Sequence, residues 1–185
     1  KAISVFKANE IKEKQKRIKN SILKTKELDS IGISLTMSSG YKLFKKESNN
    51  KFWFQRETQK GSVNLLIYTL PLYKESPNLE SIIALRDSIG KAFVPGRNKD
   101  SYLITEKAYE PYFFNTKVSS LNAFETRGTW EVINDYMAGP FLNYYIKDTK
   151  NNRTLVIEGF VFSPSVRKRE YLVELEAIVR SLKVF

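Results

Sequence analysis

The fold is decided by residues 141–162, FLNYYIKDTKNNRTLVIEGFVF. Two runs rich in aromatic and β-branched residues flank a polar segment at 148–152 that is suited to a tight turn. Apolar runs of this length, joined by a short polar turn, are typical of a β-hairpin. The stretch therefore predicts two adjacent antiparallel strands, at 141–147 and 154–162.

Outward from this hairpin, the period-two pattern predicts further strands at 31–37, 52–54, 63–70, 112–118 and 124–133. Helical spacing predicts a polar helix at 3–28, a second helix that begins at Ser76-Pro77-Asn78, and a third after residue 165. The apolar stripe expected on the last helix is Leu172, Leu175, Ile178, Val179 and Leu182.

This order of elements predicts an α+β domain with a mostly antiparallel sheet of about six to seven strands and helices packed on it. We expect residues 30–185 to form a single domain. Residues 1–29 form a basic, polar helix or a connector from an upstream region. A connector is favoured over lipid contact because no aromatic side chain follows Phe6 in this segment.

The basic charge is concentrated in the first third of the chain. Lys and Arg total 31 against 20 acidic residues, for a net charge of +11. The excess lies mainly in residues 1–29 and 40–60, so an anionic surface is one possible partner. Nucleic acid is disfavoured because lysine outnumbers arginine, the residue preferred for bidentate phosphate and base contacts. The candidate anion-contacting residues are Lys12, Lys16, Arg17, Lys42, Lys45 and Lys46. The alternative is a basic surface that only keeps the domain soluble.

Several classes of chemistry are excluded by composition. The chain contains no His and no Cys, which excludes thiol nucleophiles, imidazole bases and ordinary Cys/His zinc sites. Glycine-rich phosphate loops and calcium-binding loop motifs are also missing from the sequence. Ser-x-x-Lys recurs because lysine is abundant, and it lacks a Lys-Thr-Gly partner. We therefore expect no catalytic residues, no metal and no cofactor. No apolar run is long enough for a transmembrane helix.

Four residues are candidates for a groove or ligand site: Arg127, Trp130, Glu158 and Phe160. Glu158 lies in an apolar strand, where it forms either a structural ion pair with Arg127 on a neighbouring strand or an acid with a perturbed pKa. Gly128 is expected at a β-bulge that directs Arg127 or Trp130 into the groove. Residues 158–162 faintly resemble an RNA-binding strand, but Glu158 replaces the basic residue that such a strand needs.

The second half of the chain also carries a family pattern. Its pieces are ETRGTWE at 125–131, MAGPF at 137–141, EGFVFSP at 158–164, KREYL at 168–172 and LEAI at 175–178, with LRDS at 85–88 and VPG at 94–96 upstream. With this set, residues 30–183 resemble the C-terminal part of an uncharacterised Bacteroidota family of predicted envelope lipoproteins, domain of unknown function 4837. The resemblance implies export to the periplasm or outer membrane, with a lipidated cysteine upstream of Lys1, and implies no activity. The element order also resembles the PsbP and Mog-type fold, but a resemblance in fold alone implies no function.

Together these features indicate a non-catalytic binding or assembly domain of an exported, lipid-anchored protein, with a protein or other envelope component as its partner. One alternative is a carboxylate-dependent enzyme that acts on an envelope substrate. The other is a binder of anionic surfaces or nucleic acid through the lysine-rich first third.

Overall fold

The structure is a computed structural model that describes residues 2–20, 22, 23 and 25–185. Its centre is an eight-stranded antiparallel sheet in the order β2-β3-β4-β9-β8-β7-β5, with β6 paired to another part of β7. A separate two-stranded ribbon joins β1 to β10. The α+β prediction is confirmed.

The helices are α1 (Ala2–Lys19), α2 (Lys26–Asp29), α3 (Leu79–Phe93) and α4 (Arg169–Val179). The strands are β1 (Ile33–Ser34), β2 (Lys42–Glu47), β3 (Lys51–Thr58), β4 (Gly61–Pro71), β5 (Leu103–Thr105), β6 (Tyr112–Val118), β7 (Leu121–Val132), β8 (Ala138–Asp148), β9 (Arg153–Phe162) and β10 (Lys183–Val184).

The hairpin read from residues 141–162 lies in the middle of the sheet. Strands β8 and β9 pair from Phe141↔Phe160 to Asp148↔Arg153 around the polar turn. Strand β9 also pairs with β4 on its other side, so neither of its edges is exposed. This central position explains why β9 is almost continuously buried rather than alternating between buried and polar residues.

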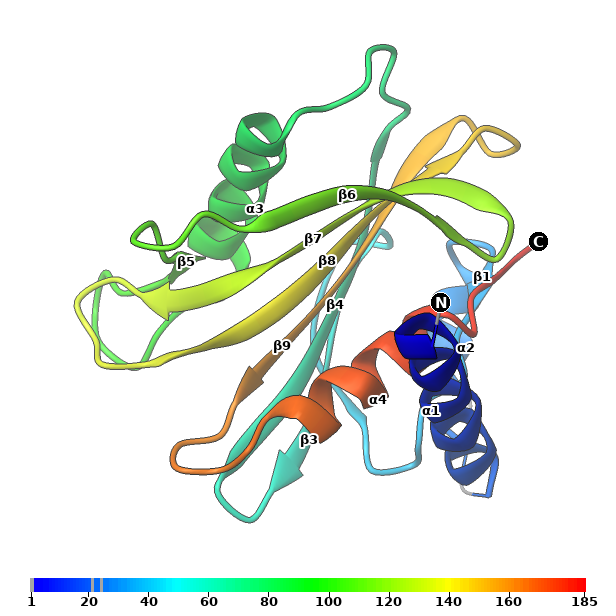
Figure 1. Ribbon diagram of the computed structural model, residues 1–185. Helices are drawn as coiled ribbons and strands as arrows, with labels where there is room; N and C mark the ends of the chain where they lie inside the picture. Colours follow the sequence, from blue (N-terminus) through cyan, green and yellow to red (C-terminus); the bar gives the residue numbers. More distant parts are fainter. Residues whose placement is uncertain (1, 21, 24) are drawn as a thin grey trace.

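Both faces of the sheet are covered, and each carries its own apolar core. Figure 1 shows α4 and α1 on one side of the sheet, and α3 over the other side. The α4 face contains Leu65, Ile157 and Leu175 in one buried cluster. The α3 face contains the second cluster, with Trp53 and Phe160. Because side chains alternate along a strand, neighbouring residues of β9 belong to different cores.

The N-terminal region differs from the predicted helix at 3–28. Helix α1 ends at Lys19, Ile22 forms a bridge with Ser38, and the short helix α2 begins at Lys26. The Leu23 N–H donates to the Met37 carbonyl, and the side chain of Leu28 in α2 is completely buried. The chain turns back because tertiary burial and these backbone bonds outweigh helix propensity, which is a weak preference.

Residues 31–37 keep the predicted alternation, although only Ile33–Ser34 forms ladder bonds, with β10. The strand prediction missed β2, β5 and β10. Strand β2 reads KLFKKE and lies at the edge of the sheet, so it carries no alternating apolar pattern. Short or edge strands of this kind give little periodic signal.

Gly90 provides a test of how closely α3 approaches β5. A Cβ added at this glycine would lie 2.0 Å from the Leu103 carbonyl oxygen. In an exposed helix, Gly→Ala stabilises by roughly 0.5–1 kcal/mol. Here we expect Gly90→Ala to destabilise by about 1–3 kcal/mol, because the helix must move off the strand. Urea denaturation measures the change, with Ser88→Ala on the exposed side of α3 as the control. A stabilised Gly90→Ala variant would contradict this packing.

Candidate functional site

A pocket opens on the α3 face of the sheet, beside the C-terminal end of α3. Its volume is about 180 Å³. Strands β3, β4, β7 and β9 form its base, and the segment that follows α3 forms one side. The lining residues are Trp53, Gln55, Ser62, Asn64, Val94, Pro95, Gly96, Arg97, Leu103, Trp130, Val132, Met137, Phe160 and Phe162.

Strand register brings the base of the pocket together. Asn64 is the cross-strand partner of both Gln55 and Phe160, which places one residue from each of three neighbouring strands side by side. Ser62 pairs with Phe162 one step further along the same face. Alternation along each strand keeps these side chains on the α3 face, away from α4.

Aromatic rings form the apolar walls. The ring centroids of Trp130 and Phe160 are 5.6 Å apart, and those of Trp53 and Phe160 are 6.0 Å apart. Phe44 is exposed on β2 and packs on Trp53 at 4.5 Å. A register shift between Leu43 and Lys45 places Phe44 there. Bulges commonly redirect a side chain in this way.

One wall of the pocket is polar. Asn64 is only 1% exposed, and its carbonyl oxygen accepts hydrogen bonds from Trp53 Nε1 at 3.0 Å and Gln55 Nε2 at 2.9 Å. Its amide nitrogen donates to the Ser62 hydroxyl oxygen at 3.0 Å. These bonds fix the orientation of the Asn64 amide and of the Trp53 ring.

A buried ion pair lies next to the pocket, beneath α3. Arg86 donates to Glu158 Oε1 at 2.9 Å and to the Thr105 hydroxyl at 2.8 Å. Asn143 donates to the other Glu158 oxygen at 3.0 Å. The Arg86 guanidinium also lies 3.8 Å from the centre of the Phe141 ring. Both Glu158 oxygens are engaged, so the structure supports the ion-pair interpretation of Glu158.

The same cluster affects a neighbouring tyrosine. Burial, followed by the negative charge of Glu158, raises the pKa of Tyr68 far above its ordinary value. Tyr68 is therefore neutral at any physiological pH. The buried hydrogen bonds of Arg86 therefore connect α3 to Thr105 of β5 and to Glu158 of β9.

The four candidate groove residues separate into three environments. Trp130 and Phe160 both line the pocket, whereas Glu158 lies beneath α3 on the same face. The predicted contact between Glu158 and Arg127 is wrong. Arg127 pairs across strands with Leu142, which belongs to the core on the α4 face, so its side chain is on the opposite side of the sheet from Glu158.

The expected bulge at Gly128 is also wrong. Strands β7 and β8 pair in regular register through Gly128↔Phe141 and Trp130↔Gly139, and Trp130 is only 1% exposed. The glycine serves packing instead, because an added Cβ would lie 2.8 Å from the Phe141 ring. Any bulkier residue would displace the ring that stacks on Arg86.

Arg127 belongs to an ionic cluster that connects the sheet to α4 and α1. It pairs with Glu125 on its own strand and with Glu176 on α4, at 2.6 Å for the latter. Lys7 of α1 reaches Glu176 at 3.1 Å, and Arg180 lies within 4 Å of both carboxylates. The cluster therefore holds three elements together and leaves no single charge unpaired.

We expect the docking of α1 to weaken at acid pH. Burial alone would raise the pKa of Glu176, but Arg127 and Lys7 outweigh burial and hold it below its ordinary value of 4.5. A depressed pKa contributes stability above pH 4.5 that is lost as the pH falls through the folded-state value. The hydrogen-exchange protection factors of the α1 amides should therefore fall below that pH. Glu176→Gln should remove much of this dependence, whereas Glu13→Gln, whose partner Lys16 is on α1 itself, should preserve it.

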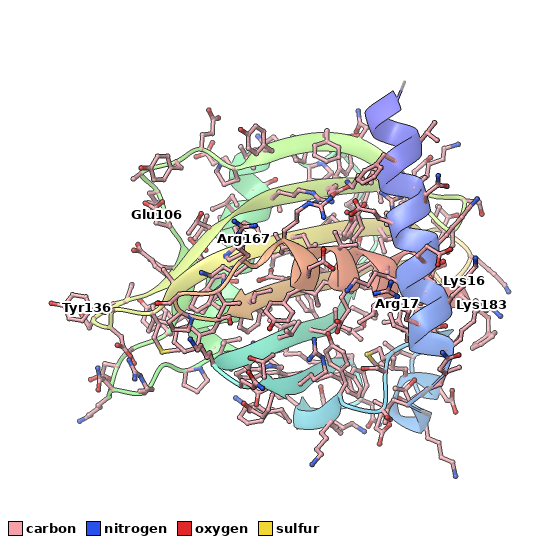
Figure 2. All side chains as sticks on the ribbon, turned by 60° about the horizontal axis from the view of Figure 1, so that its bottom comes forward. Lys16, Arg17, Glu106, Tyr136, Arg167 and Lys183 are labelled. Carbon is pink, nitrogen blue, oxygen red and sulfur yellow. The ribbon has the colours of Figure 1, made fainter. Side chains whose placement is uncertain are left out.

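The six candidate anion-contacting residues lie on two separate elements. Lys12, Lys16 and Arg17 are on α1, and Figure 2 shows Lys16 and Arg17 at the end of the molecule opposite Tyr136. The other three, Lys42, Lys45 and Lys46, are on β2. Lys45 donates to the Phe93 carbonyl and lies over the Phe93 ring on the α3 face. Arg17 lines a groove with Glu10, Glu13 and Glu170, so its surroundings are of mixed charge. Anion contact stays a prediction.

Sequence reasoning missed Arg86, Asn64 and Gln55. A signal for Arg86 was present, because it lies four residues after Ile82 and four before Gly90, in the centre of the buried face of α3. An arginine at the centre of an apolar stripe needs a buried partner. Asn64 gave a weaker signal, as a single amide within an otherwise apolar strand.

The described part of the chain gives no sign of a metal or membrane-spanning site. No group of three or more acidic side chains that could hold a metal ion occurs there. Among the same residues, no helix is both long and apolar enough to span a membrane.

Comparison with known proteins connects this architecture to a family. The family model described as "Domain of unknown function (DUF4837)" matches residues 19–181. The chain belongs to this family. A search of curated proteins found no match to this DUF4837 domain.

Solved structures with the same arrangement include Mog1 proteins. The Saccharomyces cerevisiae Ran-binding protein Mog1p superimposes with a TM-score of 0.51 at 11% sequence identity, covering 83% of this chain and 90% of that chain. A point mutant of the protein Mog1 gives a TM-score of 0.47 at 8% identity, with the same coverage. At such low identity the likeness to Mog1p concerns the fold alone, and it confirms the Mog-like sandwich predicted for this domain.

Proposed function

We propose that this domain is a non-catalytic binding module that docks a protein partner at the pocket on the α3 face. The observation that carries the proposal is the pocket itself, with aromatic walls and a fixed amide on one side. Ligand sites for small molecules usually enclose about 300–1,000 Å³. A pocket of about 180 Å³ is better suited to one large side chain of a polypeptide.

The state of the carboxylates supports binding rather than catalysis. Glu158 is held by Arg86 and Asn143, and Glu125 and Glu176 are held by arginines. A carboxylate that acts as an acid or base must reach the substrate. Glu158, the best placed for the alternative of a carboxylate-dependent enzyme, is only 1% exposed, and each of its two oxygens accepts a hydrogen bond.

The fold likeness makes a protein partner reasonable. Mog1p is described as a Ran-binding protein, so the same architecture carries a protein-binding surface in at least one case.

We further propose that the protein is exported and lipid-anchored in the cell envelope, on the basis of the sequence resemblance. Fractionation of cells that make the full-length protein, with metabolic palmitate labelling, tests this location. Recovery of an unlabelled protein in the cytosol would contradict it.

Site-specific photo-crosslinking in the native cells tests docking at the pocket. A benzoylphenylalanine at Tyr136, an exposed residue next to the lining residue Met137, should capture a defined partner. The same group at Phe185, an exposed residue that follows Lys183 closely, should not, because Figure 2 shows Lys183 at the opposite end of the molecule from Tyr136.

Adduct yields of a variant with a filled pocket and of a matched control variant show whether the partner uses the pocket. Ser62→Phe places a ring in the pocket from a half-buried lining position, and it should abolish the Tyr136 adduct. Ser88→Phe adds the same ring on the exposed side of α3 and should leave the adduct unchanged. Equal adduct yields in the two variants would show that the partner does not use the pocket.

A further inference from the structure

The two kinds of wall in the pocket restrict the side chain that can enter it. Most of its lining residues are aromatic or aliphatic, among them Trp53, Trp130 and Phe160. Its polar lining residues are Gln55, Ser62, Asn64 and Arg97, and Arg97 is already paired with Asp135. A guest that satisfies both must have a flat apolar body and a polar tip. Phenylalanine lacks the tip, and leucine lacks the ring.

The polar wall has hydrogen-bonding capacity that the described residues do not use. The Ser62 hydroxyl accepts from Asn64, and its own proton has no acceptor within the described chain. Gln55 donates to Asn64, and its carbonyl oxygen accepts from no described residue. Gln55 and Ser62 are only half-buried and line the pocket, so a guest hydroxyl is the natural partner for these groups.

We infer that the side chain taken by the pocket is a tyrosine of the partner polypeptide, an assignment that rests on the proposed function. Its ring packs among the aromatic walls, and its hydroxyl meets the polar wall by accepting from the Ser62 hydroxyl and donating to the Gln55 carbonyl. Tyrosine supplies a large contact area with few rotatable bonds, so immobilising it costs little conformational entropy. A site that is built to bond a hydroxyl rejects the analogue without it, because its own polar groups are then left unpaired.

The chain carries a built-in reporter for this assignment. It contains only two tryptophans, and both line the pocket. In a ¹⁵N–¹H correlation spectrum of the full chain they give two indole N–H signals, which report occupancy directly. The probes are Ac-Gly-Gly-Tyr-Gly-Gly-NH₂, the same peptide with Phe or Leu at the centre, and the side-chain analogues p-cresol and toluene.

We expect the tyrosine peptide to shift both indole signals and to bind about tenfold or more tightly than the phenylalanine peptide. Ser62→Ala and Gln55→Leu remove parts of the polar wall, and they should reduce this preference while leaving toluene binding unchanged. The matched control Ser88→Ala should preserve the preference. Ser62→Phe should abolish binding of every probe.

Each other result overturns the assignment in a distinguishable way. Equal affinity for the tyrosine and phenylalanine peptides would overturn the tyrosine assignment but leave docking at the pocket intact. Binding of p-cresol without binding of any peptide would show that the pocket takes a free phenol rather than a polypeptide side chain. If no probe shifts either indole signal, both the assignment and the proposed docking site are wrong.

Discussion

Replacing Arg86 with methionine is expected to lower the free energy of unfolding by about 3–5 kcal/mol. The substitution preserves much of the side-chain volume but leaves the Glu158 carboxylate buried without its counter-charge. It also removes a hydrogen bond to Thr105 and the contact between the guanidinium and the Phe141 ring. An uncompensated buried charge accounts for most of the expected loss.

Urea denaturation of the single and double variants separates charge from packing. Adding Glu158→Gln to Arg86→Met removes the unpaired charge while retaining a side chain that can bond Asn143. The double variant should therefore recover a large part of the lost stability. A loss below about 1 kcal/mol for Arg86→Met alone would show that Glu158 reaches water or another cation, contrary to the buried pair described above.

Leu175→Ala should cost about 2–5 kcal/mol, the range for a fully buried leucine. Leu175 has no exposed surface, and it packs directly above Gly159 of β9. An added Cβ at Gly159 would lie 2.8 Å from a Leu175 methyl carbon, so helix and strand are in close contact there. Removing the leucine leaves a cavity that neither backbone can easily close.

The same contact predicts a compensating pair. Gly159→Ala alone should destabilise by about 1–3 kcal/mol through overpacking. Combined with Leu175→Ala, it should cost less than the sum of the two single changes, because the new methyl group occupies part of the cavity. Thermal and urea unfolding of the four proteins measure this coupling. Strict additivity would mean that Leu175 and Gly159 do not share the space assigned to them.

The sequence was sufficient for the elements that pack through regular apolar patterns. The hairpin at 141–162, the apolar stripe of α4 and the start of α3 at Asn78 all follow from local chemistry. The N-terminal helix was predicted too long because its end depends on contacts with Met37 and Ser38. Those contacts are tertiary, so no propensity within the helix itself reveals them.

The candidate site was predicted only in part for a similar reason. The structure places Trp130 and Phe160, two of the candidate groove residues, side by side in the pocket. Whether Glu158 meets Arg127 or Arg86 depends on the register between strands and on which face α3 covers. A one-residue difference in register exchanges the two faces of a strand. Sequence patterns fix the face of a residue within its own strand but not the relation between strands.

The order of strands also has a consequence for how the chain folds during synthesis. On the side towards the centre of the sheet, strand β4 pairs with β9, for example Ser62 with Phe162. Strand β1 pairs with residues 183 and 184, near the end of the chain. The segment VNLLIY at 63–68 is therefore made long before the strand that covers it. Non-local pairing of this kind slows folding, and an uncovered apolar strand is prone to aggregation. The nascent chain is thus expected to expose this segment until β9 has left the ribosome.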